Sequence, residues 1–226
     1  MHLNSFLLFK KYASPYFKSN LKVIEIGANG PSQYYDLIKP AIGNWHSLNL
    51  AGIDAAAGWA YHIESKNEYS FPVDTGSYDI VLSGQVIEHV RDIYLWMEEL
   101  YRIARPGGLV ITINPVSWPY HEAPVDCWRI YPEGMKALTE RIGFRLLLSK
   151  FESLELEYFG YPDKFIKMPN CIVPGISIAD DAFSIYKINR LKLKLNGILT
   201  YLPLLRAFMP GIKIAYDTIT IIQKPG

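Results

Sequence analysis

Residues 78–91, Tyr-Asp-Ile-Val-Leu-Ser-Gly-Gln-Val-Ile-Glu-His-Val-Arg, decide the fold of this chain. The apolar run predicts a buried strand, and the polar residues that follow predict that the strand ends beside a functional site. Two further blocks flank this stretch. Residues 23–30, Val-Ile-Glu-Ile-Gly-Ala-Asn-Gly, precede it, and residues 100–113, Leu-Tyr-Arg-Ile-Ala-Arg-Pro-Gly-Gly-Leu-Val-Ile-Thr-Ile, follow it. Each block contains another apolar run that is typical of a buried strand.

The composition bounds the class of protein. The chain has 226 residues, half of them hydrophobic, which predicts one globular domain over residues 1–226. A formal net charge of +1 does not favour a nucleic-acid partner. Cys127 and Cys171 have no metal-ligand spacing, so we expect buried or half-buried free thiols, a reducing compartment and no metal site. Neither a signal peptide nor a membrane span is evident, which predicts a cytoplasmic protein.

Predicted strands alternate with predicted helices along the chain. This order favours a mostly parallel sheet with helices on both faces, preceded by a helical lead-in at residues 1–20. We interpret residues 160–212 as an insertion or lid placed before a last strand at 213–224. The other predicted strands are 21–27, 46–50, 60–64, 80–83, 109–113, 144–148 and 153–158, and the predicted helices are 31–40, 91–105 and 132–142.

The first strand is followed by a short loop that contains glycine. A strand, glycines and a helix together form a ligand site, because the backbone can approach a ligand closely. Gly27-Ala28-Asn29-Gly30 matches a pyrophosphate cradle poorly. The acid Glu25, two residues before the first glycine, suits a ligand with a cationic amino-acid end instead. An ordinary strand-to-helix turn remains an alternative.

The three blocks, in this order, resemble the class I S-adenosylmethionine-dependent methyltransferases whose later motif reads Glu-His-Val. The resemblance implies an α/β, Rossmann-like fold: a seven-stranded, mostly parallel sheet with one antiparallel strand and helices on both faces. It also implies that S-adenosylmethionine is bound at the carboxyl ends of the first strands.

The resemblance assigns cofactor contacts residue by residue. Asn49 stands where the family has an acid that binds the ribose; it also fits a strand-end cap, and Asp54 is a second candidate for the ribose. Glu64 or Ser65 is expected near the adenine, although both also fit an exposed loop. The expected contacts are Glu25, Gly27, Ala28, Asn29, Gly30, Asn49, Glu64, Ser65, Ser83, Gly84 and Gln85. Ser83 and Gln85 could equally cap the next helix.

A second polar and aromatic segment follows the strand at 109–113. It resembles a sub-branch thought to methylate sugars of cell-surface polysaccharides, through His121, Glu122, Pro124, Asp126, Trp128, Arg129, Pro132 and Gly134. We predict that His121 is the catalytic base, oriented by Asp126 or Glu122, with His89 as the second candidate. The acceptor is expected to contact Glu88, Tyr120, Glu122, Trp128, Arg129 and Tyr131. A structural knot of His121, Arg129 and Asp126 is an alternative.

Residues 183–206 form a basic amphipathic stretch. A lid or a homodimer surface is one interpretation, and peripheral contact with an anionic membrane is another. The sequence as a whole predicts O-methylation of a sugar hydroxyl in a glycan or small-molecule acceptor. A methyltransferase for small aromatic or lipid acceptors, and a binding module without activity, remain open as alternatives.

Overall fold

The computed structural model describes residues 3–28, 30–39, 44–52, 61–158, 176–178 and 212–226. Seven strands form one sheet in the order β3-β2-β1-β4-β5-β9-β6. The strands are β1 (Lys22–Ile26), β2 (Asn44–Leu50), β3 (His62–Ser65), β4 (Tyr78–Gly84), β5 (Ala104–Pro115), β6 (Arg145–Glu152) and β9 (Asp217–Gln223).

The pairing of the strands gives the sheet its polarity. Strands β1 to β5 pair in parallel, whereas β9 is antiparallel to both of its neighbours, β5 and β6. The predicted sheet of seven strands with one reversed strand is therefore confirmed. The carboxyl ends of β1 to β5 lie along one edge, and β9 begins at that edge.

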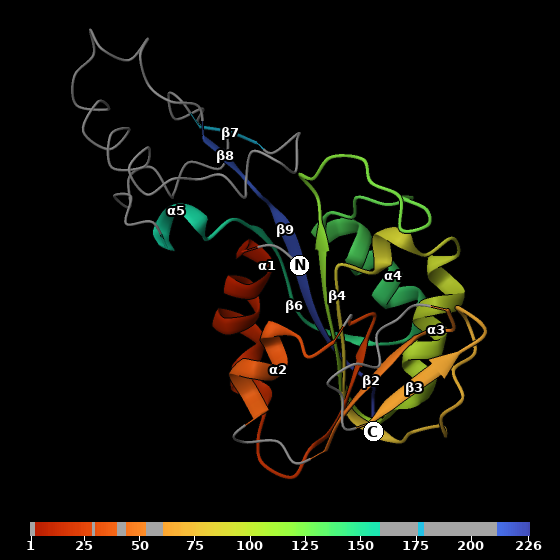
Figure 1. The fold of residues 1–226 in the computed structure, drawn as a ribbon. Coiled ribbons are helices and arrows are strands. Elements are labelled where there is room, and N and C mark those ends of the chain that lie inside the picture. Colours follow the sequence, from red (N-terminus) through yellow and green to blue (C-terminus); the bar gives the residue numbers. More distant parts are fainter. Residues whose placement is uncertain (1–2, 29, 40–43, 53–60, 159–175, 179–211) are drawn as a thin grey trace, which may run out of the picture.

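Helices cover both faces of the sheet. Figure 1 shows α1 (Leu3–Leu8) and α2 (Gln33–Ile38) on one side, and α3 (Ile93–Ile103) and α4 (Pro132–Ile142) on the other. Successive strand side chains point to opposite faces and bury two separate apolar clusters. Ile80 and Leu82 of β4 join the cluster beneath α1 and α2, while Val81 joins the cluster beneath α3 and α4.

Short elements complete the described chain. After α1, a π-helical turn (Phe9–Ala13) and a 3-10 turn (Ser14–Tyr16) lead towards β1. A second 3-10 turn, Ile87–His89, follows β4. A separate parallel pair consists of β7 (Ile176–Ile178) and β8 (Ile212–Ile214). None of the described helices is long and apolar enough to cross a membrane.

Three expectations need correction. Residues 153–158 are not a strand, because they contain the short helix α5 (Glu155–Tyr158), which follows β6 directly. In that segment the buried Glu155 accepts a hydrogen bond from the backbone amide of Ala215, an interaction that replaces strand pairing. The predicted last strand is divided into β8 and β9. Cys127 is a free thiol, as expected, but it is exposed rather than buried.

Much of the predicted insertion, residues 160–212, lies outside the described residues, as does the basic stretch 183–206. Cys171, Asn29 and Asp54 lie outside them as well. Among the described residues, the candidate site lies at the carboxyl ends of β1 to β5.

Candidate functional site

The order of the strands reverses between β1 and β4, which are neighbours in the sheet although β2 and β3 separate them in sequence. In open α/β sheets, ligands bind in the crevice at such a reversal. Two glycines bring the loops at this point close together. Gly27 has a φ of +82°, and a Cβ there would collide with Cγ2 of Val86 from the loop after β4. A Cβ on Gly84 would lie 2.7 Å from the hydroxyl of Tyr34 on α2.

Glu25 stabilises the loop after β1 through two hydrogen bonds to its side chain. Its Oε2 accepts hydrogen bonds from Ser32 Oγ at 2.8 Å and from Trp45 Nε1 at 3.0 Å. Ser32 is also the N-cap of α2, where its Oγ accepts from the amide of Tyr35. Burial raises the pKa of Glu25 to about 7, although the two hydrogen bonds act to lower it. The carboxyl group therefore ties the first turn of α2 to β1 and β2.

Asn49, at the end of β2, also stabilises the loop that follows β1. Its side chain is buried, and Nδ2 donates to the carbonyl of Ala28 at 2.7 Å. The structure thus shows Asn49 holding the loop that follows β1. The amide of Gly27 donates to Leu48 O, which gives this loop a second anchor on β2.

A hollow of about 530 Å³ lies at the carboxyl ends of β2 and β3. Its volume is in the range of small-molecule sites. Of the two residues expected near an adenine, Ser65 borders the hollow, whereas Glu64 is exposed and is not among its lining residues. Ser65 Oγ also hydrogen-bonds Asn67 and Ser70 in the adjoining turn. The lining is completed by Leu50, Ala51, Lys66, Asn67, Glu68 and Tyr69.

The loop after β4 has an unusual backbone. Gln85 has a φ of +61°, uncommon for a residue other than glycine, and its Nε2 donates to Asp217 Oδ1 at 3.2 Å. The next helical element is the 3-10 turn Ile87–His89, whose N-cap is Val86 and which has no side-chain cap, so the capping alternative does not hold for Ser83 and Gln85. Ser83 is buried, and its Oγ has no hydrogen-bond partner in the part of the chain that the structure describes.

The segment between β5 and α4 arches over the carboxyl edge on the side of α3 and α4 (Figure 1). Three hydrogen bonds attach it to the turn after β4. Cys127 N donates to Glu88 O at 2.6 Å, Trp128 Nε1 donates to Val90 O at 2.7 Å, and His89 Nδ1 pairs with Val125 O at 2.6 Å. These contacts bring the two predicted polar clusters into one site.

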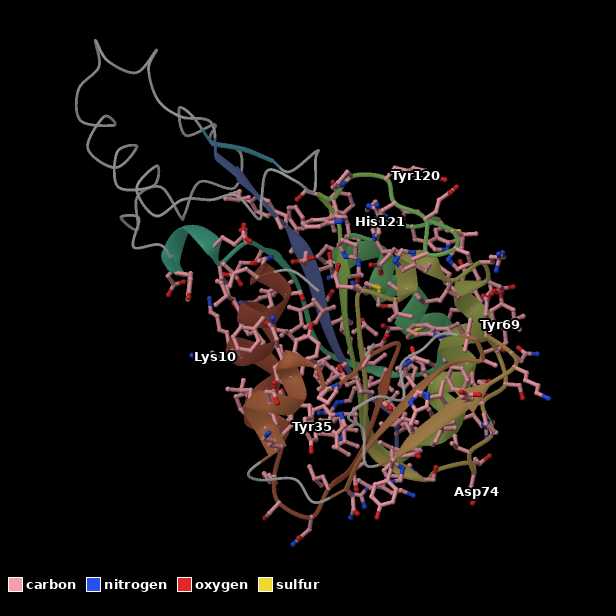
Figure 2. The ribbon with its side chains drawn as sticks, viewed as in Figure 1. Lys10, Tyr35, Tyr69, Asp74, Tyr120 and His121 are labelled. Carbon is pink, nitrogen blue, oxygen red and sulfur yellow. The ribbon has the colours of Figure 1, made fainter. Side chains whose placement is uncertain are left out.

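Within this site, two imidazole rings lie beside a buried carboxyl group. The rings of His89 and His121 meet edge to face with centroids 4.8 Å apart. Glu88 is fully buried, and its Oε1 lies 3.8 Å from His89 Nε2. Burial raises the pKa of Glu88 to about 8, and burial also lowers the pKa of His89. Figure 2 shows His121 next to Tyr120.

The carboxylate of Asp126 is hydrogen-bonded to other residues of the protein. Its two oxygens accept from the two terminal nitrogens of Arg129, at 2.5 and 2.7 Å, and Oδ2 also accepts from the backbone amide of His121 at 2.8 Å. Burial would raise the pKa of Asp126, but these hydrogen bonds and the charge of Arg129 outweigh it and lower the pKa. The knot that was considered as an alternative is therefore present. Because His121 Nδ1 lies 3.4 Å from Asp126 Oδ2, the same carboxylate can also orient the imidazole.

Several aromatic rings of this segment face solvent. The exposed fractions are 71% for Tyr120, 36% for Trp128 and 56% for Tyr131. Tyr120 donates its hydroxyl to Glu122 at 2.6 Å, so Glu122 does not orient His121 in this arrangement. Exposed rings on the same segment as His121 and Glu122 form a surface suited to a polar, ring-containing molecule.

Comparisons with known proteins agree with this geometry. Residues 48–112 match the family described as "Methyltransferase domain". A solved structure of an S-adenosylmethionine-dependent methyltransferase from Archaeoglobus fulgidus superimposes with a TM-score of 0.58, covering 97% of this chain and 92% of that one at 16% identity. This chain has the class I methyltransferase fold.

One sequence match and one further solved structure name methyltransferases with other acceptors. A demethylmenaquinone methyltransferase from Staphylococcus saprophyticus is 25% identical over 95 residues, a match that spans 42% of this chain and about two fifths (40%) of that enzyme. Phosphoethanolamine N-methyltransferase 2 from Haemonchus contortus, solved with S-adenosyl-L-methionine, has a TM-score of 0.54 at 13% identity. The comparison covers 98% of this chain and 52% of that one.

The methyltransferase fold also gathers polar residues that the sequence analysis missed. Asn4 on α1 is fully buried, and its Nδ2 donates to Asp217 Oδ2 at 2.7 Å and to Glu152 O at 2.9 Å. These bonds seat α1 on the ends of β6 and β9, next to Gln85. No local pattern marks Asn4 or Asp217, because the partners named here lie more than 130 residues away in the sequence.

Proposed function

We propose that this protein transfers the methyl group of S-adenosylmethionine to a sugar hydroxyl in glycan or cell-surface polysaccharide synthesis. The observation that carries the proposal is the meeting of the Gly27 loop with the loop after β4, at the reversal of strand order. That place is the one at which the class I fold offers a ligand site. The family match over residues 48–112 supports the same chemistry.

The cofactor would lie across the ends of β1, β2 and β4. Gly27, Ala28 and Gly30 supply backbone close to the ligand, and Asn29 belongs to the same proposed loop. Ser83, Gly84 and Gln85 border the ligand from β4. Ser65 lines the 530 Å³ hollow, and Asn49 directly precedes its lining residue Leu50, so the ribose and adenine would fit there. Glu64 remains a weaker candidate because it does not line the hollow.

We assign Glu25 and Asn49 mainly to positioning. Glu25 holds Ser32, and Asn49 holds Ala28, so both keep the loop between β1 and α2 in place. A role for Glu25 at the methionine end of the cofactor stays a prediction. Preorganised loops of this kind reduce the entropy that is lost when a ligand binds.

The acceptor would lie against the segment that contains His121. In the proposed step, the hydroxyl oxygen of the acceptor attacks the methyl carbon, and the carbon–sulfur bond breaks with its electron pair going to sulfur, which leaves S-adenosylhomocysteine. The hydroxyl proton passes to a free imidazole nitrogen of His121, whose orientation Asp126 supports. His89 is the second candidate for the base. Alignment of the reacting atoms supplies most of the remaining acceleration.

A sugar acceptor is favoured by the exposed rings of Tyr120, Trp128 and Tyr131 and by the exposed Glu122 on the same segment. Glu88, which was expected to contact the acceptor, is fully buried, and Arg129 is bound to Asp126. A small aromatic or lipid acceptor is the second candidate, because the Staphylococcus saprophyticus relative is named for demethylmenaquinone. The atom that is methylated is also open, since the Haemonchus contortus neighbour is named as an N-methyltransferase. We further propose a cytoplasmic location, with a lid, homodimer or membrane-contact role for residues 183–206.

Calorimetric titration of the purified chain with S-adenosylmethionine tests the first half of the proposal. No heat and no thermal shift at millimolar cofactor would exclude it and would favour a binding module without activity. The second half is tested by measuring S-adenosylhomocysteine release with nucleotide-activated sugars, simple phenols and quinols, and an amine as acceptors. Turnover with phenols, quinols or the amine but not with sugars would reject the sugar assignment and retain methyl transfer.

A further inference from the structure

We propose that Glu88, His89 and His121 form a binding site for a divalent transition-metal ion. One nitrogen of each imidazole and one oxygen of Glu88 lie within 4.8 Å of one another. Two histidines and one carboxylate are a known ligand set for zinc and for non-haem iron(II), and such a set leaves a further coordination position open. The two cysteines have no metal-ligand spacing, so the sequence alone predicts no metal site.

The buried carboxyl group is the first independent support. Glu88 is fully buried, and neither of its side-chain oxygens has a hydrogen-bond partner among the described residues. A buried carboxyl group without a partner is costly, and such groups are typically paired with a charge or bound to a metal. Arg129, whose charge acts on Glu88, already binds both oxygens of Asp126. A metal ion would supply the positive partner that Glu88 lacks.

The orientation of the two imidazoles is the second support. His89 Nδ1 lies 2.6 Å from the carbonyl of Val125, and His121 Nδ1 lies 3.1 Å from the carbonyl of Pro119. A carbonyl only accepts, so each Nδ1 carries the proton and each Nε2 keeps its lone pair. Ligand histidines in proteins characteristically donate their second nitrogen to a carbonyl or carboxylate in this way.

The ligand atoms would have to move closer together to bind an ion. With bonds of about 2.1 Å, two ligands of a tetrahedral zinc ion lie about 3.4 Å apart. The three atoms here lie within 4.8 Å of one another, so the most distant pair must close by up to about 1.4 Å. The His121 side chain is 37% exposed, which leaves its ring room to turn. Glu88 and His89 are held more firmly, since the segment 125–128 is bonded to their backbone and side chain.

The ion would change how the acceptor loses its proton, a consequence that rests on the proposed methyl transfer. A nitrogen that binds a metal ion cannot also accept a proton. An acceptor hydroxyl in the open position would instead lose its proton to solvent, because the ion lowers the pKa of a bound hydroxyl. The binding site itself does not depend on methyl transfer, and it is tested without cofactor or acceptor.

The test is titration of the EDTA-treated, dialysed full chain with zinc chloride by calorimetry, and with cobalt(II) chloride by visible absorption. The variants are His89→Asn and His121→Asn, since an asparagine amide can keep the hydrogen bond of Nδ1 but has no group at Nε2. Glu88→Gln removes the third ligand. His62→Asn is the matched control, because His62 also uses Nδ1, towards Ser47, and lies on β3 away from the site.

We expect one ion per chain and cobalt bands typical of nitrogen and oxygen ligands. Each of the three ligand variants should weaken binding by more than the roughly 10–100-fold that changes around a metal site usually cost. His62→Asn should bind as the unaltered chain does. Absence of binding, or binding that His89→Asn and His121→Asn both leave unchanged, overturns the proposal. Circular dichroism and melting temperatures identify a variant that fails to fold. Because His121 is partly exposed, His121→Asn should disturb folding least of the three ligand variants.

Discussion

Replacement of Glu25 by glutamine should make the protein more stable above neutral pH and leave its stability nearly unchanged in acid. Glu25 is buried between β1, β2 and the start of α2, and burial raises its pKa to about 7. Glutamine keeps an acceptor oxygen for Ser32 and Trp45, the two donors that Glu25 uses. It cannot ionise, so it resembles the protonated acid.

The magnitude follows from the two pKa values. In the unfolded chain the pKa of Glu25 is near its usual 4.5, so the folded state holds the proton more tightly than the unfolded state. The stabilisation is fully present below pH 4.5 and is lost as the pH rises to 7, where the folded carboxyl group itself ionises. A rise from 4.5 to about 7, at about 1.4 kcal/mol for each pH unit, amounts to about 3 kcal/mol. This value is an upper bound, because relaxation around the carboxylate reduces it.

The assay is urea unfolding at pH values from 4.5 to 8, followed by tryptophan fluorescence, for the unaltered chain and for Glu25→Gln. The difference in unfolding free energy should grow from near zero to about 3 kcal/mol, equivalent to roughly 6–12 °C in melting temperature for a chain of this size. Asp36→Asn, which removes an exposed carboxylate from α2, controls for the loss of one negative charge. A difference that stays constant with pH, or a glutamine variant that is less stable at pH 8, would refute the reasoning.

Three further outcomes are expected. Asn49→Ala should lower the unfolding free energy by about 1–3 kcal/mol, because it leaves the buried carbonyl of Ala28 without its donor, and calorimetry should show weaker cofactor binding. Gly84→Ala should destabilise the protein by about 1–3 kcal/mol through overpacking against the Tyr34 hydroxyl at 2.7 Å and its ring carbon Cε2 at 2.8 Å. The double variant with Tyr34→Phe removes only the hydroxyl and should recover part of that loss, and strict additivity in thermal melts would contradict this explanation. Arg129→Met should cost about 3–5 kcal/mol in chemical unfolding, since it leaves a buried carboxylate unpaired, and a loss below 1 kcal/mol would show that the knot is not structural.

Local patterns were sufficient for most of the elements. The helix predicted at 132–142 matches α4 (Pro132–Ile142), because Pro132 suits a first helical turn and Gly143, with a φ of +93°, ends the helix. The apolar runs before Gly27 and Ser83 likewise predicted β1 and β4. Residues 153–158 were predicted wrongly, since a short apolar and acidic run has no clear period and its structure depends on the distant contact of Glu155 with Ala215.

In the candidate site, too, motifs identified single residues, whereas their contacts depended on the tertiary structure. Sequence motifs identified His89 and His121 separately, but not that their rings touch. The glycine loop was recognised, whereas the support that Glu25 provides through Ser32 and Trp45 was not. A side-chain hydrogen bond depends on the direction of each strand face and on the register between strands, and neither can be obtained from spacing along the chain.

The sequence by itself determined the type of fold, the order of its strands and helices, and the two segments that carry the polar residues of the site. These features follow from hydrophobic periodicity and from glycine and proline, which act over a few neighbouring residues. Only the tertiary structure decided that Asn49 holds a loop and that Arg129 binds both oxygens of Asp126. It also decided that Glu88 is buried beside two imidazoles with no hydrogen bond to its side chain from the described residues. The physical reason is that burial and pairing depend on which side chains the folded sheet brings together from distant parts of the chain.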